Sequence, residues 1–106
     1  MKITDVKTAV LKGNFEFVLV RVDTDEGVSG YGECFPWAKY RETAGMARSC
    51  KPILVGQEPF PVEKLIRRMG LDARKGNVHV AAISGVETAL WDLAGKAVGQ
   101  PVHKLM

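Results

Sequence analysis

The segment Phe35–Arg41 (FPWAKYR) contains the residue types best suited to binding a small molecule. It combines three aromatic residues with two cationic ones, Lys39 and Arg41, and it fits no regular secondary structure. Loops carry function more often than cores do, and an aromatic, cation-bearing loop is suited to closing over a polar, anionic small molecule. An equally weighted interpretation is that Phe35 and Trp37 only seal a sheet against helices.

The histidines and the helix carboxylates form no catalytic arrangement in the sequence. Neither His79 nor His103 has a serine, cysteine or carboxylate at a spacing that makes a nucleophile pair. Glu87 and Asp92 are separated by about 140° around a helix, so they do not converge as an acid–base dyad. We therefore predict no catalytic residue in this chain.

The stretch Gly30-Tyr31-Gly32-Glu33 partly matches a phosphate-binding glycine loop. The third glycine of that motif is missing and Phe35 stands in its place, so we reject this interpretation. Glycines within a strand more often mark a close approach of another backbone, or a twist. Glu33 is accordingly assigned to a structural or rim position rather than to a general base.

Cys34 and Cys50 are the only cysteines, and they form neither a CxxC motif nor a zinc half-site. The histidines are too distant in the sequence to complete a metal site with them, so no metal ligand is predicted. No secretory signal precedes the cysteines, which predicts reduced thiols. No apolar run reaches the roughly 18 residues of a membrane span, which predicts a cytoplasmic protein without a membrane partner.

The charge balance indicates little about partners. The 106 residues include 15 Lys and Arg against 12 Asp and Glu, a formal net charge of +3. The densest basic run, 64–75, lacks interleaved aromatic residues for base stacking, so a solvated helix face is favoured over a nucleic-acid surface. The length favours one domain over 1–106 and excludes a (β/α)₈ barrel within it, because such a barrel needs about 250 residues.

Three strands with short connections are predicted in the first third of the chain. Residues 2–12 alternate in polarity, and 15–22 (FEFVLVRV) are rich in β-branched and aromatic residues. The second strand is apolar on both faces, which predicts a middle strand covered on both sides. Gly13-Asn14 supplies the first turn, and a polar reversal precedes the third strand, 28–34. The expected product, over 1–34, is an antiparallel β-meander.

Helices are predicted to follow over 42–98, so the fold class is α+β, a meander followed by a helical bundle. Residues 42–49 are helical in character, and Pro52 either kinks that helix or starts a new turn. Pro61 is expected to be the first residue of another helix, which ends at Gly70.

The longest predicted helix, 80–98, repeats apolar residues at helical spacing. Asp92 and Lys96 form a favourable pair one turn apart. Residues 99–106 begin another apolar-spaced turn and then stop. Because a natural terminus is usually polar and loose, we expect a fragment in which 99–106 starts a linker to a further domain.

Three stretches, in order, are similar to one known domain. They are FVLVRVDTDEGVSGYGE, VGQEPFPVEKLIRRM and AAISGVETALWDLAGKAVGQPVHKL, and together they span nearly the whole chain. The most specific part is 82–101, where ALWDL is followed by Lys96, Gly99 and Pro101. The chain resembles the N-terminal capping domain of the enolase superfamily, in the mandelate racemase/muconate lactonizing enzyme branch.

That resemblance implies a meander and helices packed against a modified (β/α)₇β barrel that begins shortly after Met106. Members of the family abstract the proton α to a carboxylate, using Mg²⁺ and a Lys or His base that are held by the barrel. None of those positions maps onto this chain. The resemblance therefore assigns no catalytic or metal-binding residue here, and the isolated chain is expected to be inactive.

The resemblance also implies that two loops of this domain cover the barrel mouth and contact the distal part of the substrate. The loops correspond to 12–15 and 35–41, and the residues expected to face substrate are Asn14, Phe35, Trp37, Tyr40 and Arg41. The parent is expected to be an acid-sugar dehydratase and a homo-oligomer that acts on a small acid sugar or another carboxylate. A racemase, epimerase or cycloisomerase of the same branch and a stand-alone interaction module are the alternatives.

Overall fold

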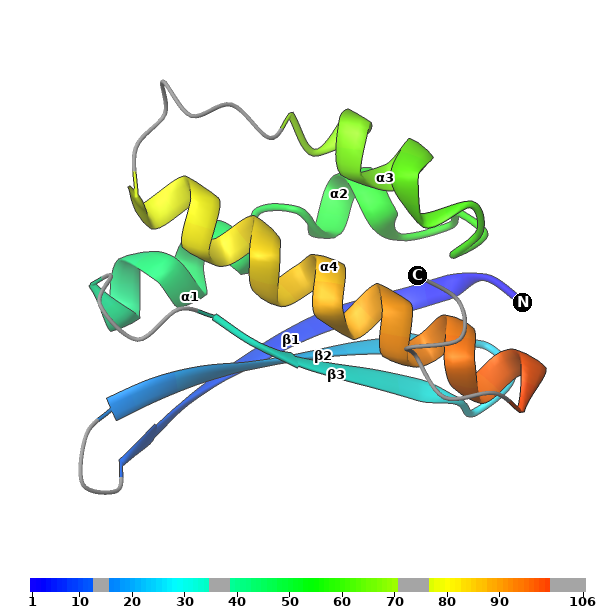
Figure 1. Cartoon of the computed structure of the whole chain (residues 1–106), viewed down its shortest axis with the longest axis horizontal. Helices are drawn as coiled ribbons and strands as arrows, with labels where there is room; N and C mark the ends of the chain where they lie inside the picture. Colours follow the sequence, from blue (N-terminus) through cyan, green and yellow to red (C-terminus); the bar gives the residue numbers. More distant parts are fainter. Residues whose placement is uncertain (13–15, 35–38, 71–76, 100–106) are drawn as a thin grey trace.

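All the described helices lie on one face of a single antiparallel sheet (Figure 1). The computed structural model describes residues 1–12, 16–34, 39–70 and 77–99. The elements, in chain order, are β1 (Ile3–Lys12), β2 (Glu16–Thr24), β3 (Ser29–Glu33), α1 (Tyr40–Arg48), α2 (Lys51–Leu54), α3 (Val62–Arg68) and α4 (Asn77–Val98). A meander followed by helices confirms the predicted α+β fold class, and no barrel strands are among these elements.

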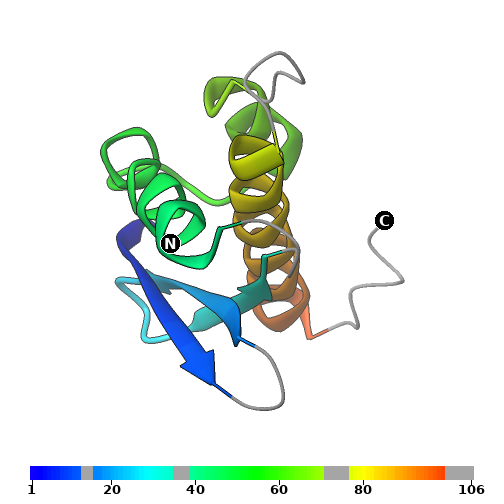
Figure 2. The ribbon, with the colours of Figure 1, turned by 90° about the vertical axis from the view of Figure 1, so that its left-hand side faces the viewer.

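The middle strand of the sheet is β2, which pairs antiparallel with both β1 and β3. Its alternate residues Val18, Val20 and Val22 are buried beneath the helices, as the two-residue period of a strand requires. The intervening Phe17 and Leu19 are only half-buried, because no described helix covers the opposite face (Figure 2). The prediction of a strand covered on both sides is therefore wrong, since apolar residues also occupy an uncovered face.

The backbones of β3 and α4 come into direct contact, and glycines make this possible. A Cβ atom added at Gly32 would overlap the carbonyl oxygen of Gly85, and one at Gly30 would overlap that of Ala89. A Cβ atom at Gly85 would lie 2.5 Å from Cys34 Sγ. Larger residues at these positions would force the strand and the helix apart, which confirms the close-approach interpretation of the strand glycines.

Two side chains of α4 form hydrogen bonds with backbone groups on the unpaired edge of β3. Asp92 Oδ2 accepts a hydrogen bond from the Tyr31 backbone N–H at 2.9 Å, and Lys96 Nζ donates to the Ser29 carbonyl oxygen at 2.8 Å. Asp92 and Lys96 form an ion pair at 3.0 Å, and the ammonium lies 4.8 Å from the centroid of the Tyr31 ring. The predicted Asp92–Lys96 pair is confirmed, and it occupies strand groups that could otherwise pair with another chain.

Several helices begin at residues other than those predicted. The first turn of α1 is at Tyr40, two residues early, and α4 begins at Asn77 rather than at 80. Pro61 precedes α3 as its extended N-cap residue instead of being its first helical residue, whereas Pro52 does start a new turn, in α2. No side-chain hydrogen bond caps α1 or α3, so the usual sequence signal for a helix start is missing there.

The hydrophobic core lies between the sheet and the helices. Its largest buried aliphatic side chains, each less than 2% exposed, come from strands and helices alike: Ile3, Leu54, Leu65, Ile83, Leu90 and Leu93. Helix α4 lies across one face of the sheet (Figure 1). The core between them therefore holds α4 in a fixed position relative to the strands.

Candidate functional site

The described strand and helix ends that flank the two segments predicted to contact substrate lie at the same end of the molecule (Figure 1). The ends of β1 and β2 that flank residues 13–15 lie there, as do the end of β3 and the start of α1, which flank 35–38. Asn14, Phe35 and Trp37 fall within these two connections, outside the described residues. Their predicted roles stay predictions.

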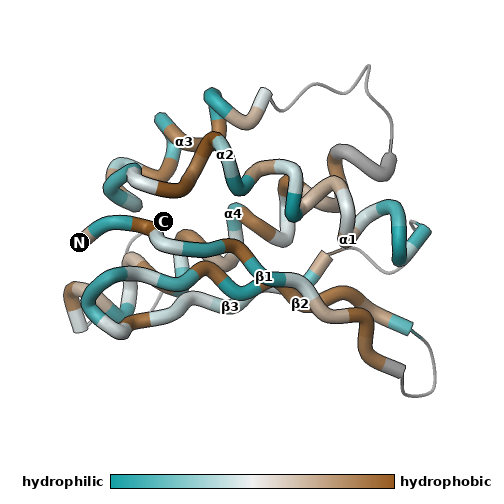
Figure 3. Tube along the Cα trace, turned by 180° about the vertical axis from the view of Figure 1, so that it is seen from behind, coloured by the Kyte–Doolittle hydropathy of each residue, from teal (hydrophilic) through white to brown (hydrophobic). Residues whose placement is uncertain are grey.

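The strand ends at this site are apolar although the helices do not cover them fully. Leu11 is 38% exposed and Phe17 is half-buried, both close to the connection between β1 and β2. Figure 3 shows apolar residues continuing along both strands to this end. An exposed apolar surface of this kind is typical of a contact surface.

Tyr40 and Arg41 lie in the first turn of α1, so a helix rather than a loop positions them. Tyr40 is half-buried and packs against the core, whereas Arg41 is exposed. Successive helical residues point about 100° apart, so these two side chains do not face the same way. The structure brings both residues to the predicted end, but it uses Tyr40 partly for packing and leaves Arg41 available to a ligand.

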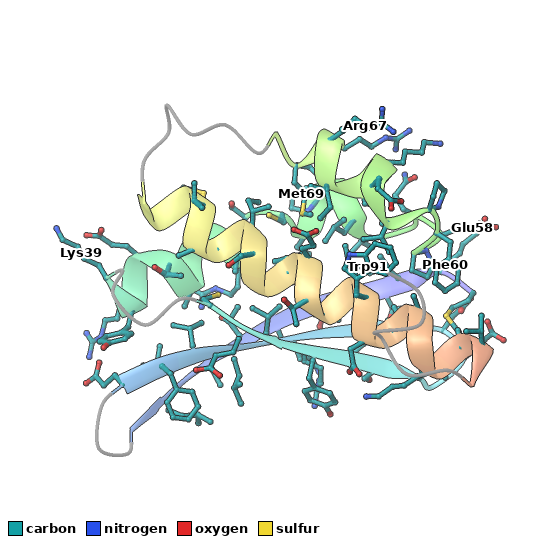
Figure 4. All side chains as sticks on the ribbon, viewed as in Figure 1. Lys39, Glu58, Phe60, Arg67, Met69 and Trp91 are labelled. Atoms are coloured by element: carbon teal, nitrogen blue, oxygen red, sulfur yellow. The ribbon has the colours of Figure 1, made fainter. Side chains whose placement is uncertain are left out.

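Positive charge gathers at this N-terminus of α1. Lys39 is the N-cap residue and Arg41 is in the first turn, where unpaired backbone N–H groups add partial positive charge. Glu42 in the same turn carries a negative charge, and its Oε1 lies 3.9 Å from Lys39 Nζ, so the two cations exceed a single carboxylate at the start of α1. Figure 4 shows Lys39 directed away from the body of the protein. The group that this end of the helix best attracts is an anion such as a carboxylate.

Thr43 is the fourth residue of α1, and no sequence motif marks it as a candidate site residue. It is 1% exposed, and its hydroxyl has no hydrogen-bond partner in the described structure. An unpaired buried hydroxyl costs about 1–3 kcal/mol. Thr24 is also buried, but its hydroxyl donates to the Val28 carbonyl oxygen at 2.7 Å. The Thr24 hydroxyl is paired locally, within the turn between β2 and β3, whereas the burial of the Thr43 hydroxyl is visible only in the tertiary structure.

The cysteines are free and buried, as expected of reduced thiols. Burial raises the pKa of both Cys34 and Cys50 to about 11, and the negative charge of Glu33 contributes at Cys34. Because both thiols are protonated at neutral pH, neither is a competent nucleophile. These residues therefore contribute packing rather than chemistry.

The remaining candidates for catalysis do not assemble into a site. The Glu33 side chain is exposed at the end of β3, and the Asp92 carboxylate is occupied by Tyr31 and Lys96. His103 and the side chain of His79 lie outside the described residues. Within the described ranges, no three His, Cys, Asp or Glu side chains come together to hold a metal ion. None of the helices described is long and apolar enough to cross a membrane.

Comparison with known proteins identifies the domain. The family model for the mandelate racemase / muconate lactonizing enzyme, N-terminal domain, matches residues 3–106. The chain belongs to this family. Membership in the mandelate racemase family confirms the resemblance found in the sequence.

Three relatives show how far the likeness extends. D-xylonate dehydratase of Haloferax volcanii is 39% identical over a match that covers 99% of this chain and 26% of that protein. The 3,6-anhydro-D-galactonate cycloisomerase of Zobellia galactanivorans superposes with a TM-score of 0.89 at 27% identity, covering 99% of this chain and 31% of that one. A mandelate racemase/muconate lactonizing protein from Paracoccus denitrificans, crystallised with magnesium, gives a TM-score of 0.87 at 34% identity, covering 98% and 30%. The chain therefore spans between a quarter and a third of the length of these relatives.

Proposed function

We propose that this domain caps the active site of a larger acid-sugar dehydratase and helps to select its substrate. The observation that carries the proposal is the 39% identity to D-xylonate dehydratase along 99% of this chain, which covers 26% of that protein. The excess of Lys39 and Arg41 over Glu42 at the start of α1 supports it, because an acid sugar offers a carboxylate and hydroxyl groups that suit cations and aromatic faces.

In this proposal the chain binds and encloses the substrate, and it transfers no proton. Arg41 and Lys39 hold the anionic or hydroxylated distal part of the substrate by charge-assisted hydrogen bonds. Asn14, Phe35 and Trp37 complete the rim and exclude water from the reacting centre. The base that removes the proton α to the carboxylate belongs to the remainder of the enzyme.

Magnesium is assigned to that remainder as well. When bound, Mg²⁺ neutralises negative charge that develops on a carboxylate substrate. The described residues of this chain include no set of three ligands for it, so none of the steps assigned to this chain passes through the metal. The full-length enzyme is proposed to be a cytoplasmic homo-oligomer.

A cycloisomerase is the second candidate for the parent enzyme. The fold match to the Zobellia cycloisomerase favours it, but at 27% identity against 39% for the dehydratase. Both reactions begin with removal of an α-proton, so the same cap serves either one. A racemase or epimerase of the same branch differs from them in the base, and a stand-alone module would lack a catalytic domain altogether.

The first test is an assay of the full-length gene product with Mg²⁺ and a panel of aldonic and aldaric acids. We expect loss of the α-proton and the β-hydroxyl of one acid as water, giving a 2-keto acid detected with semicarbazide. The 106-residue chain alone is expected to give no product. An open reading frame that stops at codon 106, or turnover by the short chain, would contradict the proposal.

The role of the cap is tested by Arg41→Ala in the full-length enzyme. Because the side chain contacts a part of the substrate that does not react, its loss removes uniform binding, and KM should rise about tenfold with little change in kcat. Arg67→Ala is the matched control, since Arg67 is an exposed arginine on α3 at the other end of the molecule (Figure 4). Equal effects of the two substitutions would count against a substrate contact at Arg41.

A further inference from the structure

The face of the sheet that no described helix covers carries a hollow beside the Tyr31 ring (Figure 2). Its volume is about 290 Å³, and the side chains around it include the apolar Ala9 and Leu19 and the cationic Lys7 and Arg21. Tyr31 is 50% exposed, and the Lys96 ammonium lies 4.8 Å from its ring centroid. A ring that is already held in place loses little conformational freedom when a partner covers it. We refer to this surface as the outer sheet face, which consists of Lys7, Ala9, Leu19, Arg21, Tyr31 and Glu33.

Positive charge exceeds negative charge around Arg21. Lys7 lies directly opposite Arg21 in the register of β1 and β2, and like charges opposite each other are destabilising. The two cations share one carboxylate, since Arg21 Nε lies 3.0 Å from Asp23 Oδ1 and Lys7 Nζ lies 3.5 Å from Asp23 Oδ2. Arg21 Nε has no hydrogen-bond partner in the described structure, and Asp5 is bound more closely by Lys51, at 2.8 Å. A second carboxylate near Arg21 would therefore be stabilised.

Glu33 offers such a carboxylate on the same face. Gly30 and Gly32 contact α4, so the alternation of a strand turns Tyr31 and Glu33 to the outer sheet face. Glu33 is exposed, and no ion pair joins it to Arg21 or to another described residue. In the register of β2 and β3, Glu33 lies opposite Leu19 and Arg21 lies opposite Tyr31. Glu33 and Arg21 are thus diagonal neighbours, and Leu19 and Tyr31 occupy the other diagonal.

This arrangement is complementary to a second copy of itself. When two such faces are stacked about a two-fold axis that lies between the sheets along the Leu19–Tyr31 diagonal, the axis exchanges the positions of Glu33 and Arg21. Each Glu33 then faces the Arg21 of the other copy, while Leu19 and Tyr31 lie opposite their own equivalents, as an isologous interface requires. The strands of the two sheets cross at a steep angle, which is one of the two ways in which sheets pack face to face. An apolar centre with charged groups around it is the usual composition of a protein interface.

We infer that two copies of this protein associate through the outer sheet face, with reciprocal Arg21–Glu33 ion pairs around a contact of Leu19 and Tyr31. The inference rests on the homo-oligomer of the proposed function, for which it names an interface, and not on the reaction. The incoming carboxylate offsets the repulsion between Lys7 and Arg21. Asp23 lies one residue pair further along the strands, at the margin of the contact, so its ion pairs remain hydrated.

The test uses two charge reversals in the full-length protein, Arg21→Glu and Glu33→Arg, and sedimentation velocity over a range of concentrations. Each substitution alone places like charges opposite each other twice per pair of copies, so the dissociation constant of the contact should rise about tenfold or more. An equimolar mixture of R21E and E33R should regain the association of the unsubstituted protein, because one variant then supplies only carboxylates and the other only cations. Arg67→Glu is the matched control, since it makes the same charge change on an exposed arginine of α3 and should leave association unchanged.

The mixture also guards against misfolding, because two unfolded variants would not restore association. Unchanged association of both single variants would overturn the inference. Weaker association that the mixture does not restore would overturn it as well, since Arg21 and Glu33 would then act within one copy or with different partners. Sedimentation needs no turnover, so restored association of an inactive full-length protein would reject the proposed activity and keep the interface.

Discussion

The β3–α4 contact and the first turn of α1 differ in how their polar groups are satisfied. Between β3 and α4, the Tyr31 N–H and the Ser29 carbonyl oxygen both have partners on the helix, and glycines let the backbones touch. At the start of α1, Lys39 provides no cap, and the buried Thr43 hydroxyl has no partner in the described structure. One region is completed by its own packing, and the other keeps a buried polar group without a partner beside exposed charged side chains.

The capping role that we propose would make use of this difference. Binding groups act best when a rigid scaffold holds them, and groups that already satisfy one another have little capacity left for a ligand. The contact between β3 and α4 supplies the rigidity. The start of α1 supplies exposed cationic side chains, which is why we propose substrate contacts there and not along α4.

The largest expected effect is that of Gly32→Ala in the β3–α4 contact. A Cβ atom there overlaps the carbonyl oxygen of Gly85 and crowds the backbone N of Ala89, neither of which can move independently of α4. The free energy of unfolding should fall by about 3 kcal/mol or more in urea titrations. Gly45→Ala in α1 is the control, because the nearest atom is Arg48 Nη2 at 3.9 Å, and it should gain about 0.5–1 kcal/mol. A neutral Gly32→Ala would disprove the close approach of β3 and α4.

A smaller loss is expected at the edge of the same contact, from Asp92→Ala. It removes the acceptor for the Tyr31 N–H and the partner of Lys96, and both side chains are partly exposed, so the loss should be about 1 kcal/mol. Asp92→Asn keeps an oxygen acceptor and should lose about half as much. Urea titrations at low and high salt separate the two effects, because salt screens only the ion pair. If the two variants were equally stable, the hydrogen bond to β3 would contribute nothing.

An effect of opposite sign is expected from Thr43→Val at the start of α1. Removing a buried hydroxyl without a partner should raise the free energy of unfolding of the 106-residue chain by about 1 kcal/mol. Thr24→Val makes the same chemical change where the hydroxyl is bonded to the Val28 carbonyl, and it should lower stability by about the same amount. Chemical denaturation of the two variants side by side measures both, and a loss of stability in T43V would mean that its hydroxyl is already paired.

Much of the fold was predictable because its signals are local. Alternation and turn residues place the three strands within about two residues of β1, β2 and β3, and the helical repeat over 80–98 lies within α4. The start of α1 was missed because Lys39 offers no capping side chain, and Pro61 fits equally well just before a helix or at its first position.

The candidate site was predictable only as a place along the chain. An aromatic and cationic segment at 35–41 indicated a binding region, and the structure puts its helical part, Tyr40 and Arg41, at the end where the first connection also emerges. The sequence could not predict that Tyr40 is half-buried and Arg41 exposed, because burial depends on which elements pack beside the helix. For the same reason Thr43 gave no sign of an unpaired hydroxyl.

The amino-acid sequence by itself determined the order of the elements, the antiparallel meander and the family, since all of these depend on neighbours in the chain and on spacing. Only the tertiary structure decided which face of β2 is covered, and that Phe60, Trp91 and Val98 meet in one groove. Burial and contact are set by residues far apart in sequence, and packing α4 against the sheet brings those residues together.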